Sequence, residues 1–143
     1  MGKVLNILKA KDSTTYSVTP DAIVYDALEI MFKKNVSALL VMEGEKLAGI
    51  FTERDYARKV ILQGKASKET LISEIMTEDL ITVSPDTTID ECMRLMTNNF
   101  IRHLPVIEDN KLVGIISIGD VVKYMIEDLR FVIQNLEHYI TGT

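Results

Sequence analysis

The sequence contains one pattern twice, and this internal repeat limits the possible folds more than any other feature. When position 18 is aligned with position 83, VTPDAIVYDALEIM falls on VSPDTTIDECMRLM. The same shift, without a gap, places VSALLVMEGEKLAGIFTERD (36–55) on IRHLPVIEDNKLVGIISIGD (101–120). A register that holds over a whole unit indicates a duplicated structural unit whose copies pack on one another.

Each copy predicts the order β-α-β-β-α. A short β segment, 17–19 or 81–84, ends at a proline, which cannot continue a central strand. The aspartate that follows begins a helical pattern, which in the first copy places Ile23, Ala27, Ile30 and Met31 on one face. Two apolar strands joined by a polar turn then predict a hairpin, with strands at 38–42 and 47–52 in the first copy and 104–107 and 112–117 in the second. A second helix follows, at 53–62 in the first copy and from Gly119 onward in the second.

A single copy of roughly sixty residues would bury too little apolar surface to form a stable fold easily on its own. We therefore expect an α+β (α/β) fold in which the two β-α-β-β-α units pack sheet to sheet with pseudo-two-fold symmetry, followed by a C-terminal helix. The expected boundaries are an N-terminal extension 1–15, a first unit 16–63, a connector 64–80, a second unit 81–127 and a C-terminal helical extension 128–143.

Charge and composition exclude several classes of function. The formal net charge is −5, so the chain has no general attraction for nucleic acid or for an anionic membrane. The only cysteine is Cys92, and no signal peptide or membrane-spanning run is present. No His/Cys/Asp cluster has metal-ligand spacing. We expect a cytoplasmic protein that requires no metal and has neither nucleic acid nor membrane as a partner.

Each hairpin ends in a similar heptapeptide, GIFTERD (49–55) or GIISIGD (114–120). A glycine within a strand often marks the close approach of backbone or ligand. Thr52 or Ser117, followed three positions later by Asp55 or Asp120, matches a helix-capping pattern. A carboxylate at that place also suits the two hydroxyls of a ribose, and the N–H groups at a helix start suit phosphate. The residues alone leave both roles open, and the two roles are compatible.

The doubled unit resembles a tandem pair of cystathionine-β-synthase (CBS) domains, called a Bateman module, over about residues 16–123. The resemblance implies adenosine ligands: AMP, ADP, ATP, NAD or S-adenosylmethionine. The ribose signature of the family is glycine, two apolar residues, Ser or Thr, two variable residues and Asp. Both copies keep it, as Gly49, Thr52 and Asp55 and as Gly114, Ser117 and Asp120. With the resemblance, ribose binding is favoured over capping alone, and AMP and/or NAD are expected in clefts between the two units.

Further site residues follow from the resemblance. Arg102 and His103 match positions where related modules direct cations toward ligand phosphates. The first copy has Ser37 and Ala38 there, so its expected phosphate contacts are Arg54 and Arg58. Lys11, before the first strand, is a further expected phosphate contact on the basis of its charge and location. Adenine walls are expected from Val18, Val36, Val83 and Ile101.

The C-terminal segment carries a stripe of apolar residues. Ile126, Leu129, Ile133, Leu136 and Ile140 recur at alternating spacings of three and four, which is a heptad-like pattern. The stripe could dock on its own domain or form an independent coiled coil. In either case it must be buried, and we expect a homodimer that is joined through helices.

Three classes of function remain to be compared. The leading one is a sensor that binds adenosine nucleotides and signals to a separate, unidentified protein by changing shape or rigidity. An enzyme is disfavoured because the sequence shows no nucleophile–base pair. The alternative is a ligand-free adaptor that only dimerises, against which Asp55 and Asp120 argue.

Overall fold

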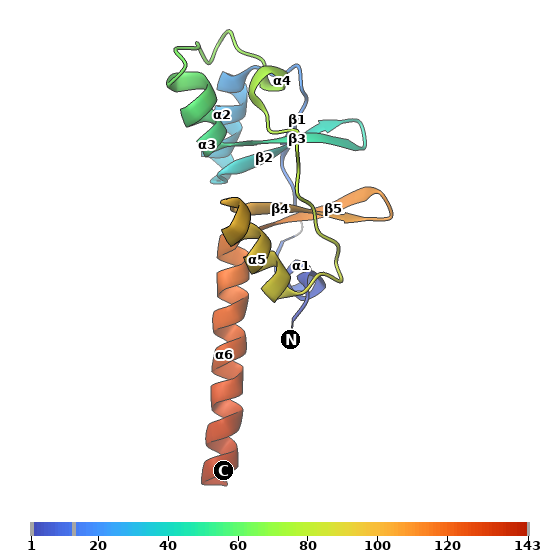
Figure 1. The fold of residues 1–143 in the computed structure, drawn as a ribbon, viewed down its shortest axis with the longest axis vertical. Helices are drawn as coiled ribbons and strands as arrows, with labels where there is room; N and C mark the ends of the chain where they lie inside the picture. The colour runs from blue at the N-terminus through green and yellow to red at the C-terminus, as the bar shows by residue number, and fades with distance from the viewer. Residues whose placement is uncertain (1, 13, 143) are drawn as a thin grey trace. The chain divides into compact units, whose positions relative to one another are not determined.

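The computed structural model describes residues 2–12 and 14–142, and these form a mixed α+β fold, as predicted (Figure 1). The chain forms two compact structural units. The first-repeat unit comprises residues 14–82 and 108–113. The second-repeat unit comprises residues 83–107 and 114–142 and the described residues of the N-terminal segment up to position 12. The sheet-to-sheet arrangement of the two units stays a prediction.

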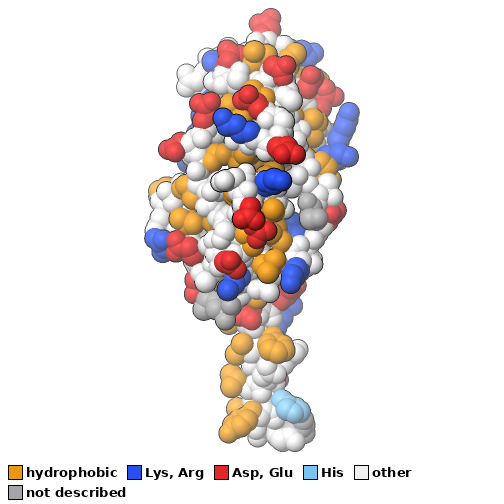
Figure 2. Space-filling model, turned by 90° about the vertical axis from the view of Figure 1, so that its right-hand side faces the viewer, with side chains coloured by type: hydrophobic (Ala, Val, Ile, Leu, Met, Phe, Trp, Pro, Cys, Tyr) orange, Lys and Arg blue, Asp and Glu red, His pale blue; other side chains and the backbone are white. Residues whose placement is uncertain are grey.

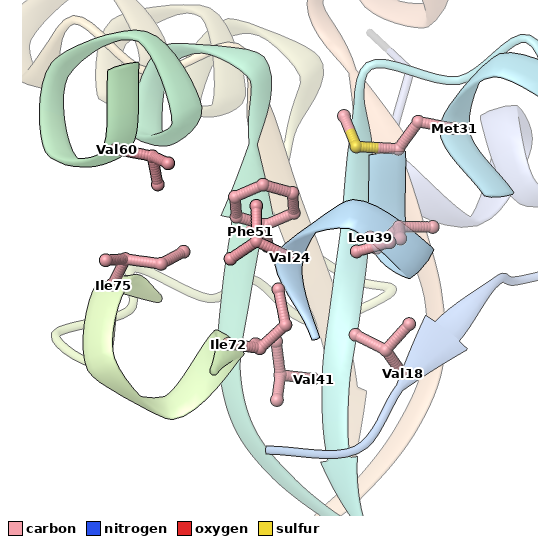
Figure 3. Close-up of a cluster of buried hydrophobic side chains, with 10 residues drawn as sticks. Val18, Val24, Met31, Leu39, Val41, Phe51, Val60, Ile72 and Ile75 are labelled. Carbon is pink, nitrogen blue, oxygen red and sulfur yellow. The ribbon is translucent and has the colours of Figure 1, made fainter. Parts of the chain in front are cut away.

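The first-repeat unit is built on a three-stranded sheet of order β1-β2-β3, formed by Ser17–Val18, Ala38–Glu43 and Lys46–Thr52. Strand β1 runs parallel to β2, and β2 pairs antiparallel with β3, with Ala38 opposite Thr52. The predicted hairpin is thereby confirmed. Apolar side chains from the sheet and the surrounding helices form the core (Figure 3), which consists of Val18, Val24, Ala27, Met31, Leu39, Val41, Phe51, Val60, Ile72 and Ile75.

Helix α2 (Val24–Lys34) begins later than the predicted start at Asp21. Its N-cap is Ile23, whose side chain makes no capping bond. The first N–H groups of the helix are instead satisfied by the following connector, because Val24 N donates to Thr70 O at 2.9 Å and Tyr25 N donates to Ser67 O at 2.9 Å. The prediction was wrong here because the partners of a helix start can come from distant residues.

The helix predicted at 53–62 is helical but irregular. It consists of one turn, α3 (Glu53–Asp55), and a six-residue π-helix, η1 (Tyr56–Ile61). The wider winding appears in the bond from Leu62 N to Ala57 O, 3.1 Å long. Short π-helical segments are rare and frequently lie at functional sites.

The second repeat forms α5 (Ile89–Asn99), the hairpin β4 (His103–Glu108) and β5 (Lys111–Ser117), and α6 (Ile118–Thr141); residues 108–113 of the hairpin belong to the first-repeat unit. The strand predicted at 81–84 is reduced to a single parallel bridge between Val83 and Val106. In the first repeat, Leu40 N donates to Tyr16 O at 3.2 Å. The aligned residue of the second repeat is Pro105, which has no N–H, so this bond cannot form and the strand is lost.

Two short helices complete the units. Helix α1 (Val4–Ala10) belongs to the second-repeat unit, where Leu5 N donates to Pro85 O at 2.9 Å. Helix α4 (Ile72–Ile75) belongs to the first-repeat unit, where Ser73 N donates to Pro20 O at 2.8 Å. Each helix therefore precedes one repeat in the sequence and packs in the unit of the other.

Helix α6 changes character along its length. Its first turns pack in the second-repeat unit and bury Val121, whereas every described residue from Ile126 onward is exposed. Hydrophobic side chains line one side of this exposed part (Figure 2), which we call the α6 tail. Among the described residues, no helix combines the length and the apolar character needed to cross a membrane.

Candidate functional site

Both copies of the heptapeptide end in a helix cap. Asp55 N donates to Thr52 Oγ1 at 3.1 Å, and Thr52 N donates to Asp55 Oδ2 at 3.0 Å. Asp120 N donates to Ser117 Oγ at 3.1 Å, and Ser117 N donates to Asp120 Oδ2 at 2.8 Å. This reciprocal pattern is a capping box, so the capping role is confirmed in both repeats.

The carboxylate of Asp55 is enclosed by donors from its own unit. Its side chain is only 9% exposed. Oδ1 accepts from Thr77 Oγ1 at 3.0 Å and lies 3.1 Å from Lys59 Nζ, while Oδ2 accepts from the N–H and the hydroxyl of Thr52. A carboxylate offers about four acceptor positions, and here three hydrogen bonds and the ion pair with Lys59 surround it.

The carboxylate of Asp120 has a different environment. Oδ2 accepts from Ser117 N and from Lys11 Nζ, both at 2.8 Å, and no hydrogen bond from a described residue reaches Oδ1. Lys11 Nζ also donates to Ile115 O at 3.0 Å. Burial raises the pKa of the Asp120 carboxyl, but the bonds from Lys11 and Ser117 and the charge of Lys11 outweigh it and lower the pKa below its usual value.

Two more of the predicted residues belong to the surroundings of Asp120. Burial lowers the pKa of His103, the positive charges of Lys11 and Arg102 lower it further, and the charge of Asp120 opposes them. These influences require Lys11, Arg102 and Asp120 each to lie within electrostatic reach of His103. The second-repeat unit therefore places Lys11, Arg102 and Asp120 around His103, and the binding roles of these four residues stay predictions.

A backbone bond holds each helix start beside the strand that precedes the hairpin turn. Ile118 N donates to Arg102 O at 2.8 Å, and in the first repeat Glu53 N donates to Ser37 O at 3.1 Å. This contact places Arg102 in the second repeat, and Ser37 in the first, at the same position beside the helix cap.

The two signature glycines make room for protein rather than for a ligand. A Cβ added at Gly49 would lie 2.8 Å from Thr77 O and 2.9 Å from Met76 Sδ. A Cβ added at Gly114 would lie 2.9 Å from Leu8 Cδ2. The sequence left open whether backbone or ligand approaches these positions, and in the structure the segment after α4 approaches Gly49 and helix α1 approaches Gly114.

The remaining predicted residues are dispersed. Arg54 and Arg58 are exposed on α3 and η1, Val18 and Val83 are buried, and Ile101 is half-buried. Val36 lines an open groove of about 680 Å³ in the first-repeat unit. The groove is lined by Leu28, Met31, Phe32, Asn35, Val36, Ser37, Glu53 and Tyr56. Binding roles for these residues stay predictions.

Two residues around Asp55 were missed from the sequence. Lys59 lies four positions after Asp55 on the same helical segment, a spacing at which opposite charges meet, so this signal was present. Thr77 lies in the connector, and its contact with Asp55 spans 22 positions without any local pattern. Within the described part of the chain, no group of three or more His, Cys, Asp or Glu side chains could hold a metal ion.

Comparison with known proteins decides the family. The sequence model of the CBS domain matches residues 11–61 and 72–127. The chain belongs to the CBS-domain family. It is 48% identical over 139 residues to the mitochondrial CBS domain-containing protein CBSX3 of Arabidopsis thaliana, covering 94% of this chain and 68% of that protein.

Solved CBS structures agree with this assignment. A putative signal-transduction protein with CBS domains from Burkholderia ambifaria shares 53% identity at a TM-score of 0.86, over 88% of this chain and 95% of that one. The CBS domain pair of protein MJ0100, in complex with 5′-methylthioadenosine and S-adenosyl-L-methionine, shares 27% identity at a TM-score of 0.79, over 90% and 98%. CBS pairs are regulatory modules that bind adenosine-containing ligands.

Proposed function

We propose that this chain is a sensor without catalytic activity of its own, which binds an adenosine nucleotide and passes the signal to a separate protein. AMP and NAD are the leading ligands, with ATP, ADP and S-adenosylmethionine as further candidates. The observation that carries the proposal is the Asp120 carboxylate at a helix start, paired with Lys11 at 2.8 Å, beside His103, whose pKa is influenced by Asp120, Lys11 and Arg102. A carboxylate suits ribose hydroxyls, and the three basic groups suit phosphates.

A route for the signal follows from where these groups are attached. Lys11 is the C-cap of α1, and Asp120 lies in the first turn of α6, so their ion pair joins the two helices. A nucleotide phosphate competes with Asp120 for Lys11, and its ribose competes with Lys11 for Asp120. Binding therefore changes the link at the base of α6, which is the differential contact that a ligand needs in order to shift an equilibrium.

Assembly as a homodimer is part of the same proposal. The α6 tail repeats isoleucine at one heptad position and leucine at the other, a pattern that favours pairing of two helices. Its large apolar side chains are exposed, as is Phe32, which is 88% exposed on α2. A second copy that covers them would bury apolar surface that one copy leaves in water. The mitochondrial relative from Arabidopsis does not support the expected residence in the cytoplasm, which therefore stays part of the proposal.

A thermal-shift screen of AMP, ADP, ATP, NAD and S-adenosylmethionine tests the proposed ligand class. The chain is first denatured and refolded, and mass spectrometry of the released material establishes that the protein is nucleotide-free. A ligand that binds only the folded state stabilises it by about 2.7 kcal/mol at a hundredfold excess over Kd. A flat screen on such protein rejects the sensor and favours the adaptor, which is the alternative function.

A further inference from the structure

The two ribose signatures have the same residue pattern, but their carboxylates differ in how many hydrogen bonds they already accept. Both oxygens of Asp55 receive donors, from Thr52, Thr77 and Lys59. In Asp120 the bonds from described residues fall on Oδ2 alone, and its side chain is 24% exposed. A ribose diol donates two hydrogen bonds, so it needs acceptor positions that other groups have not taken.

We propose that the second repeat alone holds the adenosine site, with Asp120 as the ribose acceptor, and that Asp55 is a structural carboxylate. One chain then binds one nucleotide, although its sequence carries two signatures. The inference rests on the proposed function, since it names the repeat at which the adenosine ligand binds and the residue that receives its diol.

The donors around Asp55 are fixed by their own bonds, so they do not yield easily to a ligand. Thr77 is held to β3 by two backbone bonds, from Ile50 N to Thr77 O at 3.0 Å and from Thr77 N to Ile50 O at 2.9 Å. Lys59 Nζ donates to Ile75 O at 3.2 Å in addition to its ion pair with Asp55. The cluster thus joins β3, η1 and the segment after α4, and a ribose could enter only by breaking this junction.

The arrangement around Asp120 depends on fewer side chains. Lys11 is the single side chain that would have to move, and among described residues its other hydrogen-bond partner is the carbonyl of Ile115. A lysine has a long flexible stem with three donors, so its ammonium can turn from Oδ2 toward a phosphate. Asp120 can then accept the diol on both oxygens while Ser117 N keeps the cap.

The distribution of basic residues favours the same repeat by an independent criterion. Arg102 and His103 precede the second hairpin, while Ser37 and Ala38 occupy the aligned positions of the first. A nucleotide at Asp120 therefore finds two cations for its phosphates, Arg102 just before β4 and Lys11 at the C-cap of α1. At Asp55 the nearest described cation, Lys59, is already paired with the carboxylate.

Isothermal titration of the nucleotide-free full chain with AMP, and separately with NAD, tests the inference. We expect one equivalent per chain. Asp120→Asn should weaken binding at least about tenfold, the effect of losing a charged hydrogen bond. The matched variant Asp55→Asn, verified as folded by circular dichroism, should leave the stoichiometry at one and the affinity within about threefold.

The outcomes separate this inference from the proposed function. Two equivalents for the parent chain, or one equivalent that is lost in Asp55→Asn and kept in Asp120→Asn, overturns the inference while the sensor stands. Absence of binding for every adenosine compound overturns both. If Asp55→Asn does not fold, one equivalent for the parent chain together with weakened binding in Asp120→Asn supports the inference, and one equivalent with unchanged affinity in Asp120→Asn overturns it.

Discussion

Replacing Asp55 with alanine should destabilise the nucleotide-free protein more than the same replacement at Asp120. Loss of the aspartate half of either capping box, which leaves the N–H of Thr52 or Ser117 without its acceptor, costs about 1 kcal/mol. Asp55→Ala also removes the acceptor of the Thr77 hydroxyl and of Lys59 at a site that is almost closed to water, which adds about 2 kcal/mol. The ion pair of Asp120 with Lys11 is partly exposed on both sides and contributes up to about 1 kcal/mol. We expect losses of about 3 kcal/mol for Asp55→Ala and between about 1 and 2 kcal/mol for Asp120→Ala.

Urea denaturation followed by far-ultraviolet circular dichroism measures both losses. Asp128→Ala, in an exposed part of α6, serves as a control and should lie within about 0.5 kcal/mol of the parent chain. If the first-repeat and second-repeat units unfold in separate steps, Asp55→Ala should affect one step and Asp120→Ala the other. Equal losses, or a larger loss for Asp120→Ala, would contradict the structural role assigned to the Asp55 cluster.

Three further outcomes follow from other parts of the molecule. Gly49→Ala should lower the free energy of unfolding by about 1–3 kcal/mol, since the new Cβ meets a backbone oxygen at 2.8 Å. In Gly114→Ala the new Cβ meets a movable side-chain methyl, so the loss should be smaller. Equal shifts of the urea midpoint in the two variants refute this difference. The pKa of His103 in the folded state is lowered below 6.5, so the unfolded state binds more protons as the pH falls from about 7 through 6.5, and the free energy of unfolding decreases. His103→Gln should make the free energy of unfolding less dependent on pH. Parallel pH profiles for the variant and the parent chain refute this role of His103. Ile133→Glu should convert a dimer into a monomer in light scattering while Gln134→Glu should not, and a monomeric parent chain refutes the dimer.

The sequence was sufficient for features that depend on local pattern. The strands at 38–42 and 47–52 appear as β2 and β3 with ends that differ by one residue, because an apolar run, a polar turn and a second apolar run can bury one face only as a hairpin. The duplicated signature likewise predicted the caps at Asp55 and Asp120, since a capping box is formed by residues three positions apart.

Features that depend on distant partners were not predictable in this way. The strand predicted at 81–84 is absent because Pro105, which lies in a different element, lacks the backbone N–H that Leu40 donates in the first repeat. The packing of α1 and α4 in the units of the opposite repeats has no signature in either helix, because both are short and their backbone bonds go to residues far along the chain.

The difference between the two aspartates was present in the sequence, but only contacts reveal which positions carry it. Under the alignment of the repeats, the position of Lys59 is taken by Tyr124 in the second repeat, and the position of Lys11 is taken by Met76 in the first. Each carboxylate therefore has its lysine from a place where the other repeat has none. Lys59 lies on the same helical segment as Asp55, whereas Lys11, the partner of Asp120, lies near the start of the chain. Both repeats therefore pair the aspartate with a lysine, but the lysine comes from different parts of the sequence. A lysine on the same helical segment, four positions away, stays beside its carboxylate whenever that segment is formed, whereas a lysine on a separate helix can leave it. That difference in attachment is the physical reason to expect a permanent ion pair in the first repeat and an exchangeable one in the second.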